Sequence, residues 1–153
     1  LSATQEAELN RIDLNEVCNG YFGTIVTAVN QDKQEYEEKV AIMIPKNTPL
    51  PCSKTETFFT MSEGQTKVSC DVTRSTSEET DPSFVQLIWK GDLGNLPPNR
   101  PAGQAIVVTY SYDDNGMMKC KFKDSETGEE QLVDLTINNQ EADGTSANDF
   151  LID

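Results

Sequence analysis

Apolar and polar residues alternate along short segments of this chain, and turn-forming residues separate those segments. The segments rich in β-branched and aromatic residues are 21–29, 40–44, 54–60, 68–73, 105–112, 117–123 and 131–137. Such short segments, divided by turn residues at regular intervals, are typical of β-strands. No segment carries a long 3.6-residue apolar period. The sequence therefore predicts an all-β fold, an antiparallel β-sandwich or barrel.

Turn-forming residues predict how these strands are connected. Asn115-Gly116 lies between two strong strand segments, and Asn-Gly supplies the positive φ angles that a tight hairpin needs. Three prolines in 45–51 predict a rigid extended turn, since proline suits neither a helix interior nor a central strand. The charged stretch 30–39 is expected to be a loop or the tip of a hairpin.

Composition and charge then remove several classes of function. The chain has 12 Lys+Arg, 26 Asp+Glu and no His, so its formal net charge is -14. Without His there is no Ser-His-Asp or Cys-His catalysis and no His-ligated metal. The negative charge opposes nucleic-acid phosphates and anionic membrane surfaces. No apolar stretch is long enough for a bilayer, and the N-terminus lacks signal-peptide features. We therefore expect no nucleic-acid or membrane partner and a cytoplasmic location.

Cysteines and carboxylates suggest no catalytic or metal site. The four cysteines lack C-x-x-C spacing and are expected to be reduced and mostly buried, although two disulfides would suit a secreted adhesion-type sandwich. The acidic run 113–116 lacks the ligand spacing of a calcium loop. Composition leaves a glycosidase-type carboxylate pair open. No catalytic motif appears, so we expect no enzymatic activity, no bound metal and no cofactor in this chain.

Four motifs carry a family resemblance: Val40-Ala-Ile-Met-Ile-Pro-Lys-Asn-Thr-Pro-Leu-Pro51, Phe58-Phe-Thr-Met-Ser-Glu-Gly-Gln65, and the segments 101–116 and 123–129. In this order they resemble the β-subdomain of the substrate-binding domain of the seventy-kilodalton heat-shock chaperones, the DnaK type, in register over 21–137. The resemblance implies a sandwich of two four-stranded sheets whose loops form a channel for an extended apolar peptide. ATP would bind in a separate domain. The implied partners are unfolded polypeptides and co-chaperones.

The resemblance also implies which residues contact the peptide. By position they are Phe58, Val68 and Cys70 in the pocket with Thr24 or Val26, Phe59 and Met61 through main-chain groups, and Gln65 beside the channel. The alternative is that Phe58, Val68 and Cys70 are ordinary sandwich core. The net negative charge predicts a preference for apolar peptides with Lys or Arg flanks.

Some features depart from the family pattern. The acidic segment 31–39 is extra length where one half of an arch over the peptide should lie, with Tyr36 as the candidate arch residue, and Met61 is larger than usual in the other half. We expect 1–16 to be linker-like, 17–137 to be the sandwich and 138–153 to be a disordered tail, with no helical lid. A blocked channel would instead make the domain a regulatory or protein-interaction scaffold.

Overall fold

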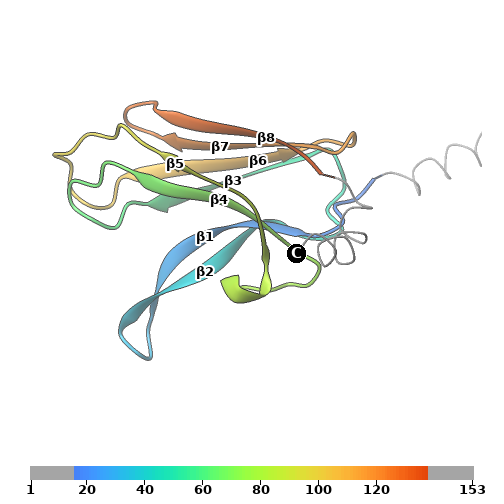
Figure 1. The fold of residues 1–153 in the computed structure, drawn as a ribbon, viewed down its shortest axis with the longest axis horizontal. Coiled ribbons are helices and arrows are strands. Elements are labelled where there is room, and N and C mark those ends of the chain that lie inside the picture. The colour runs from blue at the N-terminus through green and yellow to red at the C-terminus, as the bar shows by residue number, and fades with distance from the viewer. Residues whose placement is uncertain (1–15, 138–153) are drawn as a thin grey trace, which may run out of the picture.

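The structure is a computed structural model that describes residues 16–137, and nearly all of its regular structure is β-strand (Figure 1). The strands are β1 (Tyr21–Asn30), β2 (Glu35–Ile44), β3 (Cys52–Phe59), β4 (Val68–Ser75), β5 (Gln86–Leu93), β6 (Ala105–Tyr112), β7 (Met117–Asp124) and β8 (Glu130–Thr136). A 3₁₀ turn, η1 (Pro82–Phe84), precedes β5. No helix within residues 16–137 has the length and apolar character needed to cross a membrane.

The strands form two four-stranded antiparallel sheets, which confirms the predicted sandwich. The order is β2-β1-β4-β5 in one sheet and β3-β6-β7-β8 in the other. The inward residues of β6 and β7 alternate strictly with less buried ones, as expected for a sheet with one face against a core. The segments 1–15 and 138–153, for which we predicted a linker and a tail, lie outside the described residues.

The core lies between the two sheets and is rich in aromatic residues. Phe22 and Tyr110 are fully buried, and Phe22 meets Tyr112 edge to face with ring centroids 5.5 Å apart. On the other side of the core, Trp89 stacks on Phe122 at 6.2 Å. These pairs join β1 to β6 and β5 to β7 across the sandwich, so aromatic packing fixes how the sheets face each other.

The cysteines agree with the prediction of reduced thiols. All four are free, and Cys18, Cys70 and Cys120 are buried. Burial raises the pKa of the Cys70 and Cys120 thiols to about 12 and that of Cys18 to about 11. These side chains therefore act as small apolar core residues.

Two predicted connections need correction. Residues 113–116 do form the hairpin turn, but only Gly116 among them has positive φ, at 85°. The Asp113 carboxylate accepts hydrogen bonds from the N–H groups of Asn115 and Met117, so the turn is built by an aspartate side chain and one glycine.

The second correction concerns 30–39, which we expected to be a loop or hairpin tip. Only residues 31–34 form the turn, and β2 begins at Glu35, so the register runs through Val29 opposite Tyr36 and Asn30 opposite Glu35. Most of this outer part is exposed to solvent. A strand without a core face needs no apolar alternation, which is why its charged sequence resembles a loop.

Candidate functional site: a pocket where two strands separate

The site forms where β1 leaves its neighbour β4. The two strands pair only from Tyr21 opposite Ser75 to Gly23 opposite Thr73, whereas β1 stays paired with β2 as far as Asn30. Figure 1 shows the β1–β2 hairpin projecting away from the rest of the molecule. We call the point after Gly23 and Thr73 the fork, and the part of the hairpin beyond it the arm. A pocket of about 520 Å³ extends from the fork to the β3–β4 loop.

At the fork, the Asp71 side chain accepts one main-chain hydrogen bond that a strand partner would otherwise accept and one from a side-chain hydroxyl. Its Oδ1 accepts the Ile25 N–H at 2.6 Å and the Thr24 hydroxyl at 3.0 Å. Burial raises the pKa of Asp71, and these two donors partly offset that rise by stabilising the charged form. A carboxylate thus satisfies the first N–H group of β1 after the strands separate.

Tyr110, on β6 of the opposite sheet, forms hydrogen bonds at the fork. Its hydroxyl, on β6, lies 2.9 Å from the Gly23 carbonyl oxygen and 3.0 Å from the Asp71 carbonyl oxygen. The hydroxyl has one proton to share between these acceptors. Burial raises the pKa of Tyr110 far above its ordinary value, so the side chain remains a neutral donor. The fork is therefore held from two directions, by a carboxylate on β4 and a phenol on β6.

Seven of the eight residues predicted by position line this pocket: Thr24, Val26, Phe58, Phe59, Met61, Gln65 and Val68. Their role in binding a peptide stays a prediction. Cys70 is the exception, because its side chain is fully buried in the core between the sheets and does not line the pocket. Tyr36 also does not line it and lies exposed on the arm, so the proposed arch position is not supported by this placement.

The pocket has lining residues that the sequence did not single out. The second sheet contributes an apolar wall of Ile106, Val108 and Phe122, and the first sheet contributes polar residues that include Asp71 and Glu38. Ile106 and Val108 are two residues apart on β6, so they lie on the same face of the sheet. Nothing in the sequence marks Asp71, because alternation along 68–73 assigns it to the solvent face.

The β3–β4 loop forms the rim and is held by its own glutamine. The Gln65 Oε1 accepts the N–H groups of Met61 and Ser62 at 3.0 and 3.2 Å, and its Nε2 donates to the Lys67 carbonyl at 3.0 Å. Met61 and Phe59 remain largely exposed on the rim. The Met61 N–H is thus already bonded within the loop, which leaves its carbonyl as the main-chain group open to a ligand.

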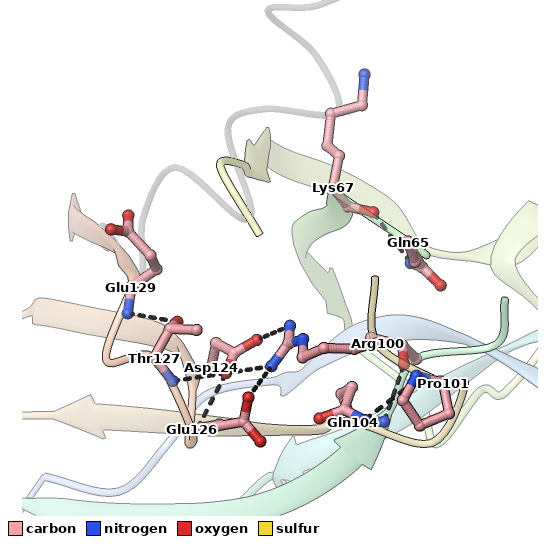
Figure 2. A network of polar contacts seen from close by, with 10 residues as sticks. Gln65, Lys67, Arg100, Pro101, Gln104, Asp124, Glu126, Thr127 and Glu129 are labelled. Carbon is pink, nitrogen blue, oxygen red and sulfur yellow. Dashed lines mark hydrogen bonds and ion pairs between the residues drawn. The ribbon is translucent and has the colours of Figure 1, made fainter. Parts of the chain in front are cut away.

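The loop between β5 and β6 contacts this rim, and Arg100 holds that loop in place (Figure 2). The Gly64 N–H donates to the Arg100 carbonyl at 2.8 Å, and Thr60 N–H donates to the Gln104 carbonyl at 3.0 Å. The Arg100 guanidinium binds both oxygens of the fully buried Asp124, at the end of β7. The ion pair between Arg100 and Asp124 of the second sheet thereby helps to position the β3–β4 loop, which carries Met61 and Gln65.

The pocket combines main-chain groups, an apolar wall and an exposed rim, and these surfaces suit an extended ligand. Within the part of the chain that the structure describes, no three cysteine or carboxylate side chains gather closely enough to hold a metal ion.

Comparison with known proteins agrees with the motifs. The family model described as Hsp70 protein matches residues 6–150. The mitochondrial heat shock 70 kDa protein of Dictyostelium discoideum is 36% identical over 108 residues, which are 71% of this chain and 16% of that protein. The mitochondrial heat shock 70-related protein 1 of Leishmania major is 33% identical over 96 residues, 63% of this chain and 15% of that protein. The chain thus spans a small part of the length of these relatives. Because the family model covers most of the chain, this protein belongs to the Hsp70 family.

Proposed function

We propose that this domain is the peptide-binding part of a heat-shock-type chaperone and that it holds extended apolar segments of unfolded proteins in the pocket at the fork. The observation that carries the proposal is the pocket itself, with an apolar wall on one sheet and exposed rim residues above it. ATP chemistry and co-chaperone binding would then belong to the full-length protein, with ATP bound in a separate domain.

The charge of the domain supports a particular class of peptide. The formal net charge is -14, which favours approach of segments whose apolar centre has Lys or Arg flanks. Association should slow as ionic strength rises, because surface charges separated by more than a Debye length are screened.

The test is fluorescence anisotropy with a labelled Leu-rich peptide that has basic flanks. We expect a Kd in the micromolar range, about -8 kcal/mol. Val26→Trp should fill the pocket and weaken binding about tenfold or more. Val29→Trp makes the same change on the same strand outside the pocket and should leave the Kd within about twofold. Circular dichroism of both variants checks that they are folded.

Two results would contradict the proposal. One is no binding of the peptide or of a reduced unfolded protein by the parent domain. The other is equal weakening by Val26→Trp and Val29→Trp, which would place any binding outside the pocket. Either result would favour the alternative of a protein-interaction or regulatory module.

A further inference from the structure

Only one of the two carboxylate oxygens of Asp71 accepts hydrogen bonds from residues 16–137. Its Oδ1 accepts both hydrogen bonds at the fork, whereas Oδ2 has no hydrogen-bond or ion-pair partner among residues 16–137. The residue is 7% exposed and lines the pocket. The fully enclosed side-chain atoms without a partner in that part of the chain belong to Thr73, Arg74 and Arg100. The Oδ2 atom is therefore not fully enclosed, and the residue that carries it lines the pocket.

The charged side chains around Oδ2 of Asp71 leave this acceptor without an ion-pair partner among residues 16–137. Glu38, opposite Thr27 on the arm, lines the same pocket and adds a second negative charge. Lys90 lies opposite Asp71 in the β4–β5 register and lowers the pKa of Asp71, but the two form no ion pair within 4.0 Å. The hydroxyl of Tyr110 on β6 donates to carbonyl oxygens. Lys67 lines the pocket but forms an ion pair with Asp92 at 3.9 Å. A buried carboxylate with a free oxygen and a carboxylate neighbour gains most from a donor that carries positive charge.

The opposite wall suits the stem of a long basic side chain. Phe58 lies beside Ile106 in the β3–β6 register, and Val108 lies beside Phe122 in the β6–β7 register. Lysine and arginine bury their methylene groups along apolar surface while their charged ends reach polar groups. The pocket offers both surfaces, an apolar wall from one sheet and a carboxylate from the other.

We infer that Asp71 is a specificity determinant that binds the ammonium or guanidinium group of a Lys or Arg side chain inserted into the pocket by the bound peptide. This inference rests on the proposed function and deepens it. It places one basic residue inside the bound segment, whereas the net charge of the domain favours basic residues in the flanks.

The test compares two peptides that differ at one central position, lysine against norleucine, which has a similar stem without the charge. Each is titrated against the parent, Asp71→Asn and Asp134→Asn. The asparagine at 71 keeps an oxygen for Thr24 and Ile25, and Asp134 makes the same charge change at an exposed position of β8. We expect the ratio of norleucine Kd to lysine Kd to fall about tenfold in Asp71→Asn and to change less than about twofold in Asp134→Asn.

A second measurement keeps the inference testable if Asp71→Asn does not fold. In the parent alone, the lysine preference should disappear on acidification as Asp71 is protonated, while norleucine binding changes little. If the parent binds neither peptide, the proposed function fails. If it binds norleucine, but the ratio is the same in Asp71→Asn or at low pH, the proposed function stands and the assignment of Asp71 is wrong.

Discussion

Replacing Asp124 with asparagine should destabilise the domain in a way that depends on pH. The carboxylate is fully buried and accepts hydrogen bonds from Arg100, from the Glu126 N–H at 3.0 Å and from the Thr127 N–H at 3.1 Å. The Arg100 guanidinium contributes most to holding the pKa of Asp124 at about 2. The native state therefore favours the ionised carboxylate more strongly than the unfolded chain does.

The size of the effect follows from this difference in pKa. An unperturbed aspartate titrates near 3.9, so a native pKa of about 2 corresponds to about 2–3 kcal/mol of stability at neutral pH. The native pKa is lowered, so this contribution is complete above about pH 4 to 5 and is lost as pH falls toward about 2. Asp124→Asn also leaves Arg100 with exposed Glu126, 3.5 Å away, as its remaining charged partner, so the total cost at pH 7 should be roughly 3–5 kcal/mol.

Urea unfolding followed by tryptophan fluorescence measures this cost, because the single Trp89 stacks on Phe122 in the core. The parent and Asp124→Asn are compared at pH 7, 5, 4 and 3, with Asp114→Asn as the control for the same change of charge in an exposed turn. The gap between parent and Asp124→Asn should narrow by about 1 kcal/mol between pH 7 and pH 3, because about half of the contribution is lost by then. A gap of equal size at every pH would refute the argument from the carboxylate charge.

Three further changes test the fork and the core. Tyr110→Phe should cost about 1–2 kcal/mol in urea unfolding, because two buried carbonyl groups lose their donor; an unchanged midpoint would contradict this. Gly23→Ala should lower the Tm, corresponding to about 1–3 kcal/mol, since an added Cβ would lie 2.5 Å from the Ala41 carbonyl oxygen; an unchanged or higher Tm would mean that β2 yields without cost. Iodoacetamide with mass-spectrometric mapping should modify half-buried Cys52 well before buried Cys70, and the reverse order would place Cys70 at the surface.

Local sequence chemistry was enough to predict most of the strands but not the length of the arm. Alternation and turn residues define strands that have one face on the core, as in β6 and β7. The outer half of β2 runs through Glu35 and Glu37, where most side chains face solvent, so hydrophobic periodicity is absent. Pairing with β1 stabilises it instead, and a pairing partner cannot be identified from periodicity alone.

The pocket residues were predicted from family position. Cys70 was predicted to line the pocket, but its neighbour Asp71 does so instead, and this difference has a physical cause. Alternation makes Cys70 and Asp71 point to opposite faces and suggests that only one face is buried. In β4, however, every residue from Cys70 to Arg74 is buried. Cys70 therefore belongs to the core between the sheets, and Asp71 reaches the pocket at the fork. The alternation along 68–73 contains no signal that both faces of this strand are buried.

The effect of Asp71→Asn on the stability of the domain distinguishes a functional role of this buried carboxylate from a structural one. Burial raises its pKa, so protonation favours the native state, and stability falls as the pH rises from the ordinary aspartate value to the raised one. Above that window the ionised carboxylate costs stability in full, and Asp71→Asn should therefore raise the Tm at pH 7 with a gain that shrinks on acidification. A purely structural carboxylate would show the opposite, a loss of Tm at pH 7 with peptide selectivity unchanged. A more stable variant that no longer distinguishes lysine from norleucine would mean that the buried charge is kept for binding.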